Sequence, residues 1–374
     1  MRVLVAPDKF KGSLTAAEAA CHIADGWLEV WPDSAIAIHP VADGGDGTLD
    51  AIAATGGTSW QTAPARDAGG RMREAAWLWQ PGTETAWIEV ARVCGLAALA
   101  PHELDPLTAT TAGIGDMLLA ARDAGARKII LCLGGSATND AGCGMAATLG
   151  FEFRDSRDNA FYPVPLSLAR LARIAAPRRL PVCEVAALTD VRNPLLGPTG
   201  ASRAYGPQKG ASPEMVVQLE YALARLAEVA ARDLPAADPR TPGAGAAGGL
   251  GFGVLAFLNG RLLPGFDTIS EATGLPAAVA AADIVITGEG RIDEQTASGK
   301  APQGVANLAR SHGKPVIAFA GLVPLSITSG AGFNALVQIT DTSMPHEYAM
   351  KHAGPLLHAA AARTAARVRQ GQIL

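Results

Sequence analysis

The sequence has little of what marks several common classes of protein. Its 374 residues include five cysteines and no CxxC pair, which is typical of small buried side chains rather than of disulfides or zinc ligands. No run of 18 uncharged apolar residues occurs, and Arg2, Asp8 and Lys9 surround a short apolar run at the amino terminus. We therefore predict neither a membrane-spanning helix nor a secretory signal, and we expect a cytoplasmic protein without a membrane partner.

Positive charge is also in short supply. The sequence has 31 basic and 35 acidic residues, which gives a net charge of −4, and no run of basic residues is present. This balance predicts that the protein has no nucleic-acid partner. The length of the chain and its 49% hydrophobic side chains favour two domains over one. The sequence does not decide the oligomeric state, and a homodimer remains open.

The common nucleotide-binding signatures are missing or weak. The sequence contains neither GxxxxGK(S/T) nor the HRD and DFG of protein kinases. Residues 243–248 fit GxGxxG, but they follow a proline-rich loop instead of a strand. Gly142-x-Gly144-x-x-Ala147 is a better match, although eight residues separate it from a predicted strand. These matches leave an NAD(P)-dependent hydroxy-acid oxidoreductase as an alternative.

The most informative stretch that is present runs from Lys128 to Gly150. Residues 129–133 form an apolar run typical of a strand buried on both faces. Gly134 and Gly135 then permit a tight turn. Small polar residues follow where a helix could begin, namely Ser136, Thr138, Asn139 and Asp140. Because a helix N-terminus binds anions, this loop predicts a phosphate site, unless the residues serve only as a turn and a cap.

The order of predicted elements indicates an α/β fold with two domains. Residues 2–6 predict a strand, and Thr15 with Glu18 predicts a capping box at the start of a helix. Residues 58–90 predict an antiparallel meander. Ser212 followed by Pro213 predicts the start of a long helix, and residues 235–251 predict a loop rich in proline, glycine and alanine. A βα pattern resumes after about residue 282, and the terminal helix is expected from Pro345 to about Val368. We expect a discontinuous, doubly wound domain of the Rossmann or flavodoxin-like kind from residues 1–57 and 283–374. Residues 58–282 would form an inserted mixed α/β domain, with the active site in the cleft between the two.

Loop lysines and loop carboxylates point to phosphate chemistry. Four of the seven lysines lie in loops, namely Lys9, Lys11, Lys209 and Lys300. A compact ammonium group beside exposed backbone N–H groups suits phosphoryl oxygens. Seven carboxylates lie at or just after predicted strand ends, namely Asp8, Asp43, Asp46, Asp140, Asp190, Glu289 and Asp293. In an open α/β sheet this edge binds ligands, although Asp46 and Asp140 also suit helix caps.

Seven short blocks carry most of these residues. The blocks are residues 6–13 (APDKFKGS), 42–48 (ADGGDGT), 134–142 (GGSATNDAG), 189–194 (TDVRNP), 205–210 (YGPQKG), 248–253 (GGLGFG) and 287–293 (TGEGRID). In this order, and over the whole chain, they resemble the bacterial type-1 glycerate kinase family, the glycerate 2-kinases. The resemblance implies a kinase that uses ATP and Mg²⁺ to phosphorylate D-glycerate, and it too implies a doubly wound domain, an inserted domain and a cleft.

The resemblance leaves some functional alternatives open. The family is associated with 2-phosphoglycerate as product, but no residue identifies the hydroxyl that is attacked, so a glycerate 3-kinase remains an alternative. A non-catalytic nucleotide or metabolite sensor on the same fold is another, because a fold alone does not establish turnover.

We assign roles to the family blocks by hypothesis. Asp190 would be the general base for the glycerate hydroxyl, and Arg192 or Arg291 would pair with the substrate carboxylate. Asn193 and Asp46 would complete the substrate site.

The remaining roles concern phosphate and metal. Phosphates would be neutralised by three lysines, Lys9, Lys11 and Lys209, of which Lys9 and Lys11 would act on the transferring group. The loop from Gly134 to Asn139 would surround a phosphate of ATP with backbone N–H groups. Mg²⁺ would be held by Asp43 or by Glu289 and Asp293.

Overall fold

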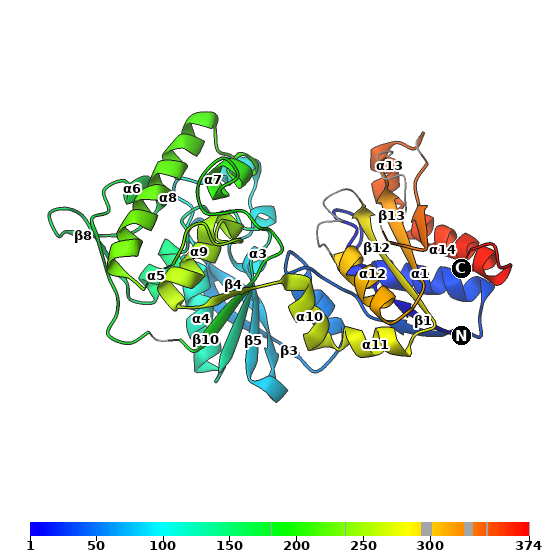
Figure 1. Ribbon diagram of the computed structural model, residues 1–374. Helices are drawn as coiled ribbons and strands as arrows, with labels where there is room; N and C mark the ends of the chain where they lie inside the picture. Colours follow the sequence, from blue (N-terminus) through cyan, green and yellow to red (C-terminus); the bar gives the residue numbers. More distant parts are fainter. Residues whose placement is uncertain (181, 236, 293–300, 325–331, 342, 374) are drawn as a thin grey trace. The chain divides into compact units, whose positions relative to one another are not determined.

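The computed structural model divides into two compact units. Unit 1 comprises Met1–Asp43, Asp50–Gly56 and Gly265–Leu374, and unit 2 comprises Gly44–Leu49 and Gly57–Pro264 (Figure 1). The structure describes all residues except 181, 236, 293–300, 325–331, 342 and 374. Each unit has its own sheet and its own hydrophobic core.

The sheet of unit 1 is parallel throughout its described strands. Its order is β14-β13-β12-β1-β2, and every neighbouring pair is parallel. The strands are β1 (Arg2–Val5), β2 (Ala35–Ile38), β12 (Ile284–Arg291), β13 (Val316–Leu322) and β14 (Ala335–Gln338). This is the βα organisation predicted for the two ends of the chain.

Helices cover both faces of this sheet because successive residues of β1 point in opposite directions. Val3 and Val5 share a core cluster with α1 (Ala16–Val30) and α14 (Ala353–Arg369), which lie side by side (Figure 1). Leu4 shares another cluster with side chains of the remaining covering helices. Those helices are α10 (Gly265–Thr273), α11 (Leu275–Ala281) and α12 (Ala301–Ser311). The unit is therefore doubly wound.

Local signals in unit 1 are confirmed at one helix and wrong at another. Thr15 accepts a hydrogen bond from the Glu18 N–H at 3.2 Å while the Glu18 carboxylate accepts from the Thr15 N–H at 2.8 Å, which is the predicted capping box. The single terminal helix expected from Pro345 to Val368 is instead α13 (His346–Lys351) followed by α14. His352 ends the first helix with φ −111° and precedes the second.

The main sheet of unit 2 combines parallel and antiparallel strands. Its order is β11-β10-β6-β5-β4-β3, with parallel pairing from β11 to β5 and antiparallel pairing from β5 to β3. The strands are β3 (Ser59–Arg66), β4 (Met72–Gln80), β5 (Thr85–Glu89), β6 (Lys128–Cys132), β10 (Glu184–Leu188) and β11 (Arg261–Leu263). The meander predicted for residues 58–90 is confirmed.

Helices and a small second sheet complete unit 2. Its helices are α3 (Val90–Cys94), α4 (Ala112–Asp123), α5 (Cys143–Thr148), α6 (Pro165–Leu168), α7 (Ala201–Tyr205), α8 (Pro213–Asp233) and α9 (Ala246–Leu258). The small sheet is antiparallel and consists of β7 (Glu152–Arg154), β8 (Ala160–Phe161) and β9 (Arg173–Ala175). Single 3-10 turns span Pro81–Thr83, Leu96–Ala98, Pro101–Glu103 and Pro207–Lys209. The Ser212 hydroxyl caps α8 as predicted, with Pro213 at its first position.

The chain changes unit at two places that the sequence pattern did not reveal. Helix α2 (Thr48–Ala54) begins in unit 2, and the boundary falls after Leu49. The return to unit 1 comes at Gly265, earlier than the expected residue 283, because Phe266, Leu275 and Val279 of α10 and α11 pack in the same core cluster as Leu4.

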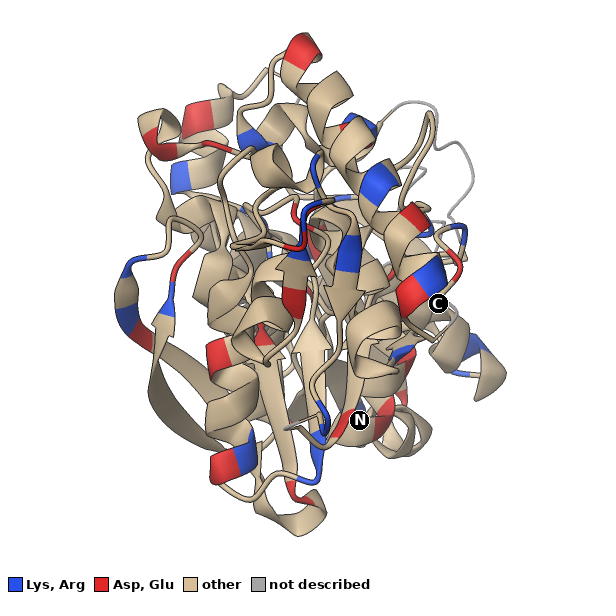
Figure 2. Cartoon of the chain, turned by 90° about the vertical axis from the view of Figure 1, so that its left-hand side faces the viewer, with Lys and Arg blue, Asp and Glu red and all other residues tan. Residues whose placement is uncertain are grey.

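Two further observations concern the chain as a whole. Acidic and basic residues are interspersed over the elements that face the viewer in Figure 2. Within the part of the chain that the structure describes, no helix is both long enough and apolar enough to span a membrane.

Candidate active site

Three segments with acidic or other polar side chains lie at one edge of the unit 2 sheet. Glu89 at the end of β5 pairs in register with Cys132 of β6, which pairs in turn with Leu188 of β10. Because these strands are parallel, the residues that follow them leave the sheet at the same edge. That edge therefore carries Glu89, the loop after residue 132, and Asp190. This is the edge at which open α/β sheets bind ligands.

The loop after β6 packs tightly against the rest of unit 2. Gly135 has φ +74°, the left-handed region that favours glycine, and a Cβ atom on Gly134 would lie 2.4 Å from the Cα atom of Gly45. The Gly134 N–H donates to the Gly44 carbonyl at 3.3 Å, and the Ala137 N–H donates to the Cys94 carbonyl at 2.9 Å. Two of the N–H groups predicted to surround a phosphate are thus engaged inside the protein.

The predicted helix start within residues 136–140 is wrong, because α5 begins at Cys143. The cause is Asp140, which is fully buried and tethers the loop to the start of α4. Its carboxylate accepts hydrogen bonds from the N–H and hydroxyl of Thr111, both at 2.8 Å, and from the N–H groups of Gly142 and Gly144 at 3.1 and 3.0 Å. Burial raises the pKa of Asp140, and these donors oppose the shift. Asp140 is therefore a structural anchor.

A glycine-rich turn of α9 packs directly on this loop. A Cβ atom on Gly248, which has φ +66°, would lie 1.9 Å from the Thr138 carbonyl oxygen. The Gly248 carbonyl accepts a hydrogen bond from the Ala141 N–H at 3.1 Å, and a Cβ atom on Gly253 would lie 2.4 Å from the Ala141 carbonyl. The block at residues 248–253 is thus explained by backbone packing. Helix α9 was missed because residues 235–251 read as a loop.

The second glycine match at Gly142 and Gly144 also serves internal packing. A Cβ atom on Gly144 would lie 2.0 Å from the Thr110 hydroxyl oxygen, and one on Gly142 would lie 3.2 Å from the Cα atom of Gly253. These glycines allow α5 to approach its neighbours closely. They therefore give no support to a dinucleotide fingerprint.

Lys209 lies inside this edge. It is only 2% exposed, and its ammonium group donates to the Thr138 carbonyl at 2.6 Å and to the Ser136 hydroxyl at 3.1 Å. Burial lowers the pKa of Lys209 to about 8, while Cys94 and Asp140 favour the charged form. Its present contacts hold the loop in shape, which is a positioning role for the site.

Asn139 is a polar side chain of the loop with unused hydrogen-bonding capacity. It is fully buried, and its Nδ2 donates to the Ser202 hydroxyl at 3.1 Å. Its Oδ1 is buried and accepts no hydrogen bond from the described residues. A buried amide oxygen of this kind is suited to a donor on a ligand or a water.

Glu89 belongs to this edge, and sequence reasoning missed it. It is completely buried at the end of β5, and it accepts hydrogen bonds from the N–H groups of Gly47 at 2.8 Å and Leu49 at 3.3 Å. Its pKa is raised to about 6, chiefly by burial and also by Asp46, while the two N–H donors and Arg92 oppose the shift. Its position after an apolar strand and ahead of Arg92 was the available signal.

Asp46 and Glu89 share the start of α2. Asp46 is exposed in the loop that precedes the helix, and its Cβ atom lies 3.7 Å from the position of a Cβ atom built on Gly135. The structure therefore brings the predicted substrate residue Asp46 beside the predicted phosphate loop.

The segment after β10 contains the predicted base and two predicted substrate residues. Asp190 is half-buried, and Arg192 is exposed with no ion pair to any described residue. Both polar atoms of the Asn193 side chain form hydrogen bonds within the protein. Its Nδ2 donates to the Thr199 carbonyl, and its Oδ1 accepts from the Tyr205 hydroxyl, both at 2.7 Å. Arg192 is thus available to an anion, whereas Asn193 shapes the loop.

Unit 1 presents a second edge, which is acidic. Asp8 follows β1, Asp43 follows β2, and Glu289 lies near the end of β12, on three adjacent strands. The pKa of Asp8 is raised to about 7, chiefly by burial and also by the carboxylates of Asp43 and Glu289, against the opposing effect of Lys9. Asp8 accepts a hydrogen bond from the Lys9 N–H at 2.7 Å. The sequence placed Asp8 at this edge but gave it no role.

Two of the predicted cationic residues lie beside this acidic edge. A Cβ atom on Gly290 would lie 3.2 Å from the Lys11 backbone nitrogen, so the end of β12 contacts the loop that carries Lys11. The side chains of Lys11 and Arg291 are exposed. Asp293 and Lys300 lie outside the described residues.

The acidic edge can be tested for its fit to a metal. Among the described residues no three His, Cys, Asp or Glu side chains converge on a metal position. The carboxylates of Asp43 and Glu289 nevertheless lie close enough to Asp8 to raise its pKa, an effect that a bound cation would oppose. Mg²⁺ is usually held by one or two carboxylates together with water and substrate phosphates, so Asp43 and Glu289 fit this ion.

Comparison with known proteins shows what the chain is similar to in sequence and fold. A family model described as "Glycerate kinase family" matches residues 3–369. The chain is 42% identical over 339 residues to a glycerate 2-kinase of Escherichia coli (strain K12), covering 89% of this chain and 87% of that protein. It is 40% identical to a glycerate kinase of Bacillus subtilis (strain 168), covering 99% and 98%. A solved structure described as a glycerate kinase 2 of Salmonella typhimurium LT2 matches with a TM-score of 0.86 at 39% identity, covering 100% and 99%.

Proposed function

Because the chain belongs to the glycerate kinase family, we propose that it transfers the terminal phosphoryl group of ATP to a hydroxyl of D-glycerate with the help of Mg²⁺. The family itself makes the chain a phosphotransferase with an alcohol group as acceptor. The structural observation that carries the finer proposal is the position of Asp8, Asp43 and Glu289 at or near the ends of three adjacent strands of unit 1, next to Lys9. Such a group is stabilised by a divalent cation and its phosphates.

In this proposal unit 1 handles the metal and the moving phosphate. Asp43 and Glu289 would hold Mg²⁺, with Asp293 as a further ligand. When bound, the ion would neutralise charge on the phosphate oxygens during an in-line transfer. Lys9 and Lys11 would add positive charge next to the acidic edge, where the transferring group needs it most.

Unit 2 would supply the acceptor chemistry and the nucleotide loop. Asp190 would accept the proton of the attacking glycerate hydroxyl, which requires a carboxylate within hydrogen-bonding distance of that hydroxyl. Arg192 of this unit, or Arg291 of unit 1, would pair with the glycerate carboxylate through two parallel hydrogen bonds. Asp46 would contact the substrate, and the loop from Gly134 to Asn139 would contact the nucleotide, with Lys209 holding that loop from within.

We propose 2-phosphoglycerate as the product, since the Escherichia coli relative is described as a glycerate 2-kinase. The test is ³¹P NMR of the purified protein with ATP, Mg²⁺ and D-glycerate, beside a reaction that lacks glycerate. A glycerate-dependent phosphomonoester signal coupled to one proton would support transfer to O2. Coupling to two protons would instead establish the 3-kinase alternative.

Intact ATP in this experiment would overturn the kinase proposal in favour of the metabolite sensor. The stereochemistry of the acceptor is tested in the same way by replacing D-glycerate with L-glycerate, for which we expect no signal. Omission of Mg²⁺ with added EDTA is expected to abolish the signal, and an undiminished signal would contradict the metal assignment.

A further inference from the structure

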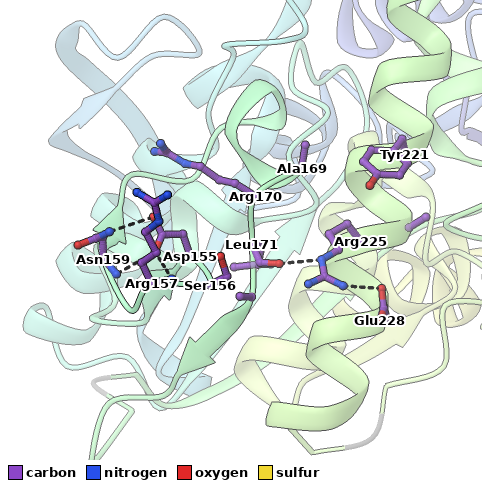
Figure 3. Close-up of a pocket in the computed structure, with 12 residues that line it drawn as sticks. Asp155, Ser156, Arg157, Asn159, Ala169, Arg170, Leu171, Tyr221, Arg225 and Glu228 are labelled. Atoms are coloured by element: carbon purple, nitrogen blue, oxygen red, sulfur yellow. Dashed lines mark hydrogen bonds and ion pairs between the residues drawn. The ribbon is translucent and has the colours of Figure 1, made fainter.

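Unit 2 contains a surface cavity of about 600 Å³ that none of the seven family blocks lines. It lies between the turn at residues 155–159, the segment at residues 169–172 and the face of α8 that carries Tyr221 and Arg225 (Figure 3). Its volume is in the range that takes up a small metabolite. The family chemistry does not account for this cavity.

The walls of the cavity are held in place by internal hydrogen bonds. The Asp155 carboxylate accepts from the N–H groups of Arg157 at 2.9 Å and Asn159 at 3.0 Å, which fixes the turn. On the opposite wall the Arg225 Nε donates to the Leu171 carbonyl at 2.7 Å, and Arg225 also pairs with Glu228 at 2.8 Å. A binding site whose walls are already ordered loses less entropy when a ligand binds.

The charges of the cavity do not cancel. Asp155 is occupied by its own turn and Glu228 by Arg225, as the dashed lines in Figure 3 show. Arg157 and Arg170 form no ion pair with any residue in the described part of the chain. Two guanidinium groups are therefore left to face a ligand.

These two guanidinium groups lie on the same side of the cavity (Figure 3). Arg170 is positioned by the Phe161 ring, whose centroid lies 4.4 Å from its guanidinium carbon. This contact covers one face of the guanidinium group and leaves its N–H edges available. The pKa of Asp155 is lowered, first by the Asn159 N–H and to a smaller extent by Arg170, so Arg170 reaches the turn that carries Arg157. Paired arginines of this kind bind carboxylate or phosphate groups bidentately.

We propose that this cavity binds a small metabolite with two or more closely spaced negative charges, through Arg157 and Arg170. Tyr221, which is 61% exposed, offers a ring and a hydroxyl to the rest of the ligand from α8. Phosphoryl and carboxylate groups share this chemistry. The proposal does not depend on the reaction catalysed by the protein.

The test is isothermal titration calorimetry of the full chain with inorganic pyrophosphate and, separately, with citrate. We expect at least one of the two to bind saturably, which also tells phosphoryl from carboxylate ligands. R157Q/R170Q should bind that probe at least about tenfold more weakly, because two charge-assisted contacts are lost. The matched control is R178Q/R179Q, which removes two exposed arginines that do not line the cavity.

The control is expected to bind the probe as the wild type does. Equal weakening in both double variants would overturn the proposal, because it would reflect general electrostatics. Unchanged binding by R157Q/R170Q, or no binding of either probe by the wild type up to about 10 mM, would also overturn it. Circular dichroism of each variant verifies that the exposed substitutions leave the fold intact.

Discussion

The two units place functional groups at the same kind of sheet edge but stabilise them differently. In unit 1 Asp8, Asp43 and Glu289 lie at or near the ends of three adjacent strands, and the pKa of Asp8 is raised to about 7, chiefly by burial and also by its acidic neighbours. In unit 2 the buried Asp140 accepts hydrogen bonds from backbone N–H groups, and the buried Lys209 donates to a backbone carbonyl. The loop at residues 134–140 packs closely against glycines of neighbouring segments. In unit 1 neighbouring carboxylates raise the pKa of a buried acid, whereas in unit 2 the buried acid and the buried lysine are held by hydrogen bonds within the protein.

This difference suggests different contributions to phosphoryl transfer. Neighbouring carboxylates are stabilised by binding a cation, so the edge of unit 1 is suited to the metal. A loop whose backbone is already held by internal hydrogen bonds changes little when a ligand binds, so the edge of unit 2 is suited to positioning. Variants can test each half of the comparison.

The largest effect is expected from Gly248→Ala in unit 2. Its Cβ atom would lie 1.9 Å from the Thr138 carbonyl at φ +66°, so the substitution adds a backbone clash to left-handed strain. We expect a loss of about 4 kcal/mol in unfolding free energy, or roughly 10 °C in Tm. The matched control is Gly197→Ala, with φ +95° and no atom within 4 Å, which should lose only about 1 kcal/mol. Equal losses by calorimetry would contradict the packing argument.

Asp190→Asn tests whether the unit 2 edge also supplies the base. The amide cannot accept the hydroxyl proton, so we expect kcat to fall by about 10³-fold with Tm nearly unchanged. The measurement is coupled ADP release under saturating ATP and D-glycerate, beside a melting curve. A large drop in Tm with little change in the kcat of the remaining folded enzyme would assign Asp190 a structural role instead.

Lys9→Ala and Lys11→Ala test the cations of unit 1. If either stabilises the transferring phosphoryl group, its removal should lower kcat by about 10²- to 10³-fold. Lys351→Ala, an exposed lysine of α13, is the matched control and should leave kcat unchanged. A change below about threefold at both positions would exclude this role for them.

Asp8→Asn tests how much the ionised Asp8 carboxylate destabilises unit 1. The folded-state pKa of about 7 lies above the ordinary value of 3.8, so the folded protein binds this proton more tightly than the unfolded chain does. Stability from this group is therefore greatest below pH 3.8 and decreases as pH rises to about 7. Because Asn carries no charge, the variant should be more stable than the wild type at pH 8, by on the order of 3 kcal/mol, and similar at pH 4.

The matched control for Asp8→Asn is the exposed Asp33→Asn, which should not change the pH profile. Thermal unfolding between pH 4 and pH 8 measures both. If Asp8→Asn melts below the wild type at pH 8, the carboxylate must be compensated by a partner, and unit 1 would then resemble unit 2.

Local sequence signals predicted the fold well and the site only partly. The capping box at Thr15, the N-cap at Ser212 and the meander of β3, β4 and β5 each depend on residues close in sequence, and all three are confirmed. The helix start near Ser136 was wrong because Asp140 binds Thr111, which lies 29 positions earlier. A cap and a long-range anchor use the same residue type, so only the three-dimensional partners distinguish them.

The same limit explains the missing residues of the site. Glu89 is an ordinary strand-terminal acid in the sequence, and its partner Gly47 is 42 positions away. Lys209 read as a loop lysine beside glycine, and its burial depends on contacts with Ser136 and Thr138 from another block. The blocks themselves were found because their order along the chain is specific, but the direction in which each side chain points could not be predicted.

The smallest effect is expected from Glu89→Gln. This variant tests whether ionisation of a buried carboxyl group destabilises unit 2 as it does unit 1. The pKa of Glu89 is raised to about 6 from 4.5, chiefly by burial, so stability from this group also decreases as pH rises, but between pH 4.5 and 6. The full cost of the charge is about 2 kcal/mol at pH 7. Gln removes that cost but places an amide N–H against one of the two backbone donors, so the gain is partly cancelled.

We therefore expect Glu89→Gln and the wild type to have similar Tm values at pH 7, with the variant losing stability relative to the wild type as pH falls to 4.5. Asp8→Asn, scanned over the same range, should change its difference from the wild type at higher pH, up to about 7. If the two profiles shift over the same pH interval, the two edges bear similar charge costs and the contrast between them fails. If Glu89→Gln shows no pH-dependent difference, the N–H groups of Gly47 and Leu49 compensate the carboxylate fully, and the contrast is sharper than the pKa of Glu89 implies.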